Sequence, residues 1–158
     1  MNRSIKTITF LLTSLLCLQL FACTKENDTQ PTNNQSDTEK IDMMKLKITI
    51  GTSSYSATLQ NNATASAFIK RLPLTLTMTE LNNNEKYADL ERNLPPNASN
   101  PGAIHNGDLM LYGSNTLALF YKSFSTSYSY TKIGEISDPE GLAEALGSGT
   151  VEVTFEMK

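Results

Sequence analysis

The segment from Gly107 to Tyr121 carries largely apolar residues on both faces of two successive strand patterns. Side chains alternate between the two faces of a strand, so each face can be followed at every second residue. Both alternating sets are mostly apolar before and after the turn Gly113-Ser114-Asn115. An antiparallel hairpin at a protein surface usually buries one face and leaves the other in water. We therefore expect this hairpin to stand between two covering layers.

Strand patterns dominate the rest of the C-terminal part of the chain. Apolar residues alternate with polar residues in four further segments, at residues 44–50, 55–59, 74–79 and 151–158. This alternation predicts strands with one buried face and one wet face. The 107–121 segment contributes two more strands, and residues 130–136 are predicted to form another.

A first short helix is predicted between the second and third of these strands. Apolar residues follow Ala65 at intervals of three, four and seven residues, which is the spacing of one helix face. Asn62 or Thr64 can cap the start of the helix, and Pro73 is expected to stop it.

A second short helix is predicted shortly before the last strand. Ser137 and Glu140 have the spacing of a capping box, an apolar stripe follows at residues 142–146, and Gly147 is expected to end the helix. Many strands with two short helices predict a mainly β fold, a barrel whose ends are plugged by the helices. In such a barrel, one face of the 107–121 hairpin fills the interior and the other faces a helix or an outer groove.

The first 22 residues have the form of a secretory signal. A short positive start is followed by a largely apolar run that is too short for a comfortable membrane span. The stretch Leu20-Phe21-Ala22-Cys23 resembles the bacterial lipobox, in which the cysteine is acylated and becomes the new N-terminus. An ordinary signal peptide with a chance cysteine is the alternative. We favour lipidation of Cys23, through acyl chains such as palmitate, because a polar tract begins directly after it.

Residues 24–40 contain no aliphatic or aromatic side chain, so we expect a disordered tether that begins at the lipidated cysteine and spans residues 23–40. The folded domain would then occupy residues 41–158. This arrangement predicts a protein of the bacterial cell envelope, anchored by its N-terminal lipid to a membrane, with the outer membrane expected. The acidic stretch from Lys25 to Asp28 resembles export tags of surface lipoproteins, and a plain hydrophilic linker explains it as well.

Several kinds of chemistry are disfavoured by composition. Cys17 and Cys23 are the only cysteines, so the mature domain has no disulfide and no thiol nucleophile. The chain has 13 basic and 16 acidic residues, and loss of the signal removes Arg3 and Lys6 but no acid, so we expect no nucleic-acid partner. His105 is the only histidine, and beside Asp108 it is weak support for a metal site. We expect a monomer without metal or cofactor.

The order of several short motifs resembles the bacterial cyclophilin-like domains, which are small β-barrels related in fold to the peptidyl-prolyl isomerases. The resemblance covers residues 44–158 and implies a closed barrel of about eight strands with a helix at each end. The motifs are Leu72-Pro73-Leu74-Thr75, Asn84-Glu85-Lys86 in the following turn, Gly107-Asp108-Leu109, Leu117-Ala118-Leu119-Phe120-Tyr121 and Ile133-Gly134-Glu135-Ile136.

The resemblance also implies where an isomerase site would lie, and most of that site is missing. Cyclophilins place an arginine on a barrel strand near the prolyl nitrogen, with Phe, Trp and His residues around it. The corresponding strand here, Leu74–Thr79, has no arginine, and the chain has no Trp. The folded part contains Arg71 and Arg92. Arg71 is expected to serve the end of the first helix, and Arg92 to lie at the surface, so we assign no catalytic residue.

A binding groove remains the favoured interpretation of this domain. Residues 124–130 are rich in Tyr and Ser, the composition of recognition loops, although a plain β-edge is an equal alternative. The long loop at residues 94–102 is expected to lie near the groove. The predicted groove residues are Thr77, Thr79, Tyr87, Arg92, Tyr112 and Phe120.

The sequence therefore predicts a membrane-anchored cyclophilin-like binding module of the bacterial envelope, without isomerase activity. Its ligand would be a peptide, a protein or a small molecule. One alternative is a divergent peptidyl-prolyl isomerase that uses Arg92 in place of the lost arginine. Another is a structural accessory of an envelope complex.

Overall fold

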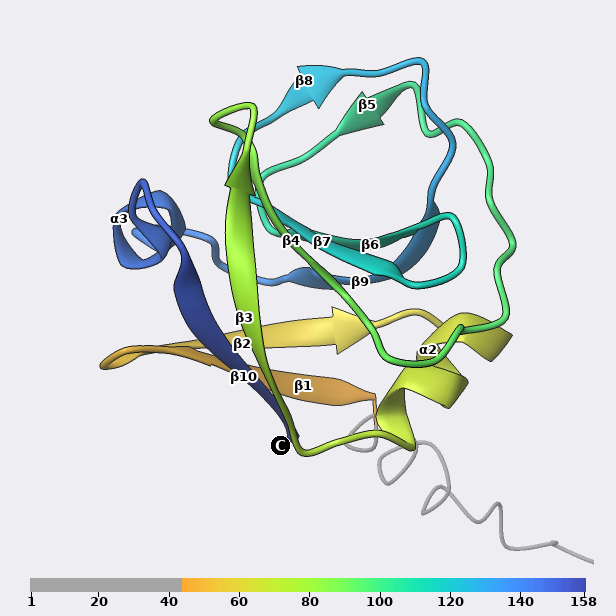
Figure 1. Ribbon diagram of the computed structural model, residues 1–158, viewed down its shortest axis with the longest axis horizontal. Coiled ribbons are helices and arrows are strands. Elements are labelled where there is room, and N and C mark those ends of the chain that lie inside the picture. Colours follow the sequence, from red (N-terminus) through yellow and green to blue (C-terminus); the bar gives the residue numbers. More distant parts are fainter. Residues whose placement is uncertain (1–43) are drawn as a thin grey trace, which may run out of the picture. The chain divides into compact units, whose positions relative to one another are not determined.

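The alternating segments form eight strands that close into an antiparallel barrel, as Figure 1 shows. The structure is a computed structural model that describes residues 44–158. The barrel order is β1-β10-β3-β4-β7-β6-β9-β2. The strands are β1 Lys45–Ile50, β2 Ser53–Leu59, β3 Leu74–Leu81, β4 Glu85–Asp89, β6 Asp108–Tyr112, β7 Thr116–Phe120, β9 Thr131–Ile136 and β10 Val151–Met157. The mainly β barrel expected from the sequence is confirmed.

The predicted signal, lipidated cysteine and tether lie outside the described residues. Within residues 44–158, no helix has the length and apolar character needed to cross a membrane.

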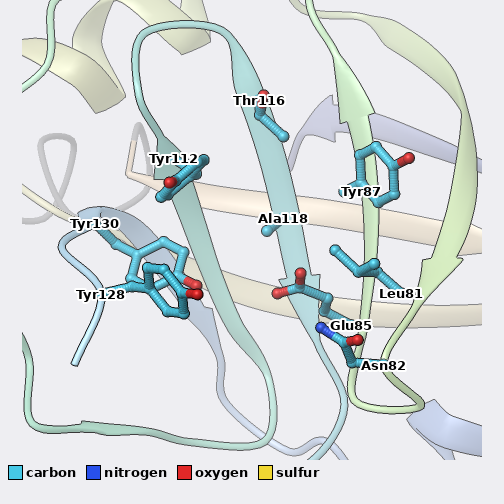
Figure 2. Close-up of a pocket in the computed structure, with 9 residues that line it drawn as sticks. All are labelled: Leu81, Asn82, Glu85, Tyr87, Tyr112, Thr116, Ala118, Tyr128 and Tyr130. Atoms are coloured by element: carbon cyan, nitrogen blue, oxygen red, sulfur yellow. The ribbon is translucent and has the colours of Figure 1, made fainter. Parts of the chain in front are cut away.

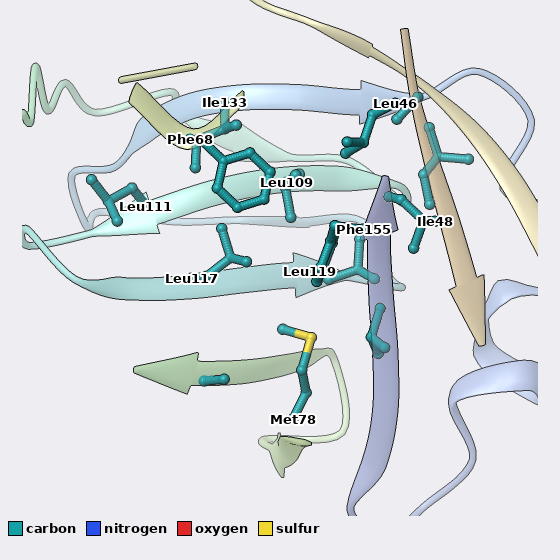
Figure 3. Close-up of a cluster of buried hydrophobic side chains, with 14 of the residues drawn as sticks. Leu46, Ile48, Phe68, Met78, Leu109, Leu111, Leu117, Leu119, Ile133 and Phe155 are labelled. Carbon is teal, nitrogen blue, oxygen red and sulfur yellow. The ribbon is translucent and has the colours of Figure 1, made fainter. Parts of the chain in front are cut away.

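The barrel interior is filled by the inward-facing residues of the strands, as the close-up in Figure 3 shows. Phe155 on β10 is fully buried, and its ring centroid lies 5.7 Å from that of Phe68 in a nearly perpendicular contact. Such an edge-to-face pair is a favoured packing of aromatic rings. The labelled core residues in Figure 3 are Leu46, Ile48, Phe68, Met78, Leu109, Leu111, Leu117, Leu119, Ile133 and Phe155.

Helix α2, at Ala63–Ile69, carries Phe68 into this core. Its N-cap is Asn62, whose side-chain oxygen accepts a hydrogen bond from the backbone N–H of Ala65 at 2.8 Å. One of the two predicted caps is therefore present. The other candidate, Thr64, is buried and donates its hydroxyl to the carbonyl of Pro95 instead, which fixes the start of the long loop against the helix.

Helix α3, at Leu142–Leu146, buries Leu142 and Leu146 in the same core, and Figure 1 shows it on the opposite side of the barrel from α2. The predicted capping box was wrong. The N-cap is Gly141, with a positive φ of 72° and no side-chain cap. Because Gly141 starts the helix, Glu140 lies before its first turn and cannot reach back as a capping-box glutamate does.

Strand β4 corrects the expected placement of Glu85 and Lys86 in a turn, whereas Asn84 does lie in the turn. The turn comprises Asn82 to Asn84, and Asn82 and Asn83 both adopt a φ of 55°, a conformation that asparagine tolerates better than most residues. Glu85 already pairs with Leu81 across the β3–β4 hairpin. The strand therefore begins at Glu85, which places its side chain at a defined position on the sheet.

The outer face of the β6–β7 hairpin has a cover of its own. Two short strands, β5 at Ala103–Ile104 and β8 at Phe124–Ser125, pair with each other and form a flap. Figure 1 shows this flap at the top of the view, above β6 and β7. It closes a second apolar cluster, separate from the barrel interior, made of Ile104, Met110, Ala118 and Phe120 with Phe124 and Tyr130 packed against them. The hairpin thus separates two cores, and its doubly apolar sequence is explained.

Candidate ligand-binding groove

Beside the flap, part of the outer face of β4, β7 and β6 is left open as a groove of about 280 Å³. Strand residues form its floor, the β3–β4 turn forms one end, and residues between β8 and β9 form a wall. We call it the tyrosine groove. Figure 2 shows its lining residues, which are Leu81, Asn82, Glu85, Tyr87, Tyr112, Thr116, Ala118, Tyr128 and Tyr130.

The tyrosine groove gathers the exposed large hydrophobic side chains of the described domain. Leu81 is 40% exposed, Tyr112 is 47% exposed and Tyr128 is 62% exposed, and all three line the groove. Single exposed apolar residues are common on protein surfaces, but a cluster in a concave site marks a place of interaction. Among residues 44–158, this property distinguishes the tyrosine groove from the remaining surface.

Three tyrosine rings form one wall of the groove. The ring centroid of Tyr112 lies 6.2 Å from that of Tyr128 and 5.6 Å from that of Tyr130. Tyr130 also contacts the buried ring of Phe120, at 5.6 Å and nearly perpendicular. Phe120 belongs to the cluster below the flap, so it supports the wall from beneath. The wall is therefore held in position by packing.

The alternation along β4 places a carboxyl group in this apolar setting. Glu85 and Tyr87 face the groove, whereas Lys86 and Ala88 face the barrel interior. Glu85 is 8% exposed, and Figure 2 shows its carboxylate directed into the space between Tyr87 and the opposite tyrosine wall. No side chain or backbone group of residues 44–158 donates a hydrogen bond to this carboxylate, and no described cation lies within 4.0 Å of it. Burial, together with the negative charge of Glu80, raises the pKa of Glu85 to about 7.

On the inner side of the same strand lies a compensated charge. Lys86 is completely buried, and its Nζ lies 2.8 Å from Oε2 of Glu80. The same oxygen accepts a hydrogen bond from the hydroxyl of Tyr121 at 2.8 Å. Burial alone would raise the pKa of Glu80, but the hydrogen bonds from Lys86 and Tyr121 and the charge of Lys86 together lower it. Glu80 is thus a partnered anion, in contrast to Glu85.

The structure brings together some of the predicted groove residues and separates others. Tyr87 and Tyr112 line the tyrosine groove, and Phe120 lies buried below it. Thr77 and Thr79 are exposed on the outer face of β3, where they pair with Glu152 and Tyr87, and they do not line the groove.

Arg92 lies in a different hollow, of about 400 Å³, that shares no residue with the tyrosine groove. The guanidinium group of Arg71 donates to the carbonyls of Arg92 and Asn93, each at 2.6 Å. This hollow is lined by Lys70, Arg71, Leu74, Thr75, Leu76, Asp89, Leu90, Glu91 and Arg92. The two arginines of the described domain therefore belong to a site away from the tyrosine groove.

Several lining residues were missed by the sequence analysis. Tyr128 and Tyr130 lie in the Tyr- and Ser-rich segment that suggested a recognition loop, but they were not assigned to the groove. The segment combines both alternatives considered for it, because β8 and a single bridge between Ser99 and Tyr130 flank an irregular stretch. Glu85 had no signal of its own, because a charged residue after three asparagines is typical of a turn.

The histidine region forms a polar turn. The backbone N–H of His105 donates to Oδ2 of Asp108 at 2.8 Å, and Oδ1 of Asp108 lies 2.9 Å from Nζ of Lys132. His105 itself is 72% exposed. In residues 44–158, no three His, Cys, Asp or Glu side chains are grouped so that they could hold a metal ion.

The fold and the groove together define a small closed β-barrel domain with an aromatic groove on its outer face. The sequence model of the Cyclophilin-like family matches residues 48–156, so the chain belongs to that family. A search of curated proteins found no significant match. The chain is also similar to the solution structure of a hypothetical protein from Archaeoglobus fulgidus, with a TM-score of 0.50 and 17% identity, covering 73% of this chain and 95% of that chain. At this identity, the likeness shows the fold alone.

Proposed function

We propose that this chain is a membrane-anchored binding module of the bacterial envelope, in which the tyrosine groove receives the ligand and no proline isomerisation is catalysed. The observation that carries this proposal is the clustering of Leu81, Tyr112 and Tyr128 in one groove. A soluble domain gains nothing in stability from such an exposed cluster, whereas a ligand would bury it.

The arrangement of the arginines supports binding over isomerase catalysis. Rotation about a peptide bond has a barrier of about 18–20 kcal/mol, so a catalyst must supply strong, directed electrostatics at the prolyl nitrogen. The tyrosine groove contains no arginine and no lysine. Arg92, the proposed substitute in an isomerase, lines the other hollow, and Arg71 is held by backbone carbonyls beside it.

The anchor is proposed from the sequence. The signal-like residues 1–22, Cys23 and the polar stretch at 24–40 have the order of a lipoprotein N-terminus. Acyl chains at Cys23 would hold the domain at a membrane, and the polar stretch would give the groove access to ligands away from the lipid surface.

Site-directed photocrosslinking in the envelope tests the binding function of the groove. The full-length chain would carry p-benzoylphenylalanine at Tyr128, and a matched chain would carry it at Thr77, which is also exposed but lies on β3 outside the groove. We expect adducts from position 128 that are weakened by Tyr112→Ala, and few from position 77. Equal adducts from both positions, or none from position 128, would contradict the proposal.

A further inference from the structure

The carboxylate of Glu85 has no cationic partner among residues 44–158. Its residue is more than nine-tenths buried, its carboxylate opens into the tyrosine groove, and no group of residues 44–158 neutralises it. The neighbouring Lys86 is unsuited to this purpose, because it faces the barrel interior and pairs with Glu80. A buried carboxylate is normally paired, because removing an uncompensated charge from water is costly. The missing partner is therefore a feature that a ligand can supply.

We propose that the tyrosine groove binds an organic cation, an ammonium or guanidinium group held between the tyrosine rings with Glu85 as its counterion. This inference rests on the proposed binding function of the groove and adds the chemical class of the ligand. The cation is either a free small molecule or the side chain of a peptide.

The surroundings of Glu85 favour a cation over the other ligand classes. Tyr87 stands on one side of the groove, and Tyr112, Tyr128 and Tyr130 stand on the other, as Figure 2 shows. The faces of aromatic rings attract cations, and cages of several rings recognise alkylammonium groups. An anionic ligand would meet the charge of Glu85 with no lysine or arginine to offset it. A purely apolar ligand would bury the carboxylate without a partner, which is costly in free energy.

The protonation state of Glu85 should make cation binding sensitive to pH. The acidic group near it is Glu80 on β3, on the other side of the sheet, whose charge adds to burial in raising the pKa of Glu85. Burial raises the pKa values of the facing tyrosines Tyr121 and Tyr130 to about 12, so both stay neutral near pH 7. Three further phenols line the groove, on Tyr87, Tyr112 and Tyr128. Because the pKa of Glu85 is about 7, its ionised fraction rises about tenfold between pH 6 and pH 8. The apparent affinity for a cation should rise by the same factor.

Choline and its neutral carbon isostere, 3,3-dimethylbutan-1-ol, form a matched pair of probes that differ in charge. The full-length protein would be titrated with each by calorimetry at pH 8 and pH 6. The chain has six Tyr and no Trp, and Tyr87, Tyr112, Tyr128 and Tyr130 line the groove, so tyrosine fluorescence gives an independent signal. We expect choline to bind at least about tenfold more tightly than the isostere, and to weaken about tenfold at pH 6. The isostere should show no pH dependence.

Variants test whether Glu85 is the counterion. Glu85→Gln keeps the size of the side chain and removes the charge, and it should weaken choline binding about tenfold and abolish its pH dependence. Glu152→Gln makes the same chemical change on the exposed face of β10, outside the groove, and should leave binding unchanged. Tyr128→Leu keeps an apolar side chain but removes a ring, and should weaken choline more than the isostere.

The source of the cation is identified with two further probes, Nα-acetyl-lysine amide and Nα-acetyl-arginine amide, which both keep a charged side chain. Tighter binding of either amide than of choline indicates a peptide ligand, and the reverse indicates a free alkylammonium compound. The proposal is wrong if no cation binds, if choline and its isostere bind equally, or if Glu85→Gln binds choline as well as the unchanged protein does. Should these fail while the Tyr128 crosslink persists, the groove binds a ligand of another class. Absence of the crosslink as well would contradict the proposed binding function of the tyrosine groove.

Discussion

Lys86 and Glu80 face each other across the β3–β4 pair, with Nζ of Lys86 2.8 Å from Oε2 of Glu80. The lysine is fully buried and also donates to the carbonyl of Gly149, which precedes β10. The ion pair joins the two strands of the β3–β4 hairpin, and the hydrogen bond to Gly149 connects this hairpin to the segment that follows α3. Glu85, the residue before Lys86, faces the other side of the sheet and has no such partner.

Lys86→Ala should destabilise the domain strongly, because it leaves the carboxylate of Glu80 inside the protein without its cation. Removal of one member of a buried ion pair typically costs about 3–5 kcal/mol. Urea unfolding followed by circular dichroism measures the loss. The double variant Lys86→Met with Glu80→Gln removes both charges and keeps an acceptor for Tyr121, and it should recover much of the stability. A double variant as unstable as Lys86→Ala would show that packing, and not charge, accounts for the effect.

Glu85→Gln should stabilise the domain at alkaline pH and not at acidic pH. The pKa of Glu85 rises from 4.5 to about 7 on folding, mainly because the group is buried. Between these values the folded state holds a proton that the unfolded state releases, so the stability of the unchanged protein falls as the pH rises through this window. Glutamine does not titrate, so its contribution to stability does not change over this pH range. The variant should therefore gain nothing at pH 4 and up to about 3 kcal/mol at pH 8.

The measurement is the free energy of unfolding in urea at several pH values for both proteins. Glu152→Gln on the exposed face of β10 is the control, and its stability curve should run parallel to that of the unchanged protein. Parallel curves for Glu85→Gln would mean that Glu85 is ionised near pH 5 as in the unfolded chain.

The domain should not accelerate proline isomerisation of an Xaa-Pro peptide above the rate in buffer. The tyrosine groove has no cation to direct at the prolyl nitrogen, and Arg92 lies in the separate hollow beside Arg71. Exchange spectroscopy by NMR measures the rate without a coupling protease. Catalysis that disappears in Arg92→Ala with an unchanged fold would support the divergent isomerase, and catalysis that persists in that variant would require a mechanism without either arginine.

Cys23→Ser should release the protein from the membrane fraction into the soluble fraction, because serine cannot accept the thioether-linked lipid. Fractionation followed by immunodetection measures the distribution. Cys17→Ser is the matched control, since Cys17 lies within the predicted signal and should not affect anchoring. Retention of Cys23→Ser in the membrane fraction would show that another feature holds the chain there.

The barrel strands were predictable where alternation was long and regular. Met78 on β3 and Phe155 on β10 belong to patterns of several apolar residues at every second position, and both are fully buried. Strand β4 was not located, because its first residues, Glu85 and Lys86, are charged and follow three asparagines. A lysine inside a barrel is stable only with its ion pair, and that pair depends on contacts between separate strands.

The groove was only partly predictable for a related reason. Tyr112 lies on an expected strand, and Tyr87 was predicted as a groove residue although its strand β4 was not, whereas Tyr128 reaches the groove through a segment with little regular structure. Thr77 and Thr79 share the outer surface of the barrel but not its hollow, because the boundaries of a groove are set by the flap and by ring packing. Neither of these leaves a periodic signal in the sequence.

The division of β7 between two cores separates the tasks of its neighbouring residues. Leu117 and Leu119 pack inside the barrel, while Ala118 lies in the outer cluster and on the floor of the groove. Substitutions at alternate positions therefore address different compartments of the molecule. Substitutions at Thr116, Ala118 and Tyr112 could reshape the tyrosine groove while the barrel interior stays unchanged. The same barrel could then carry grooves with different ligand preferences.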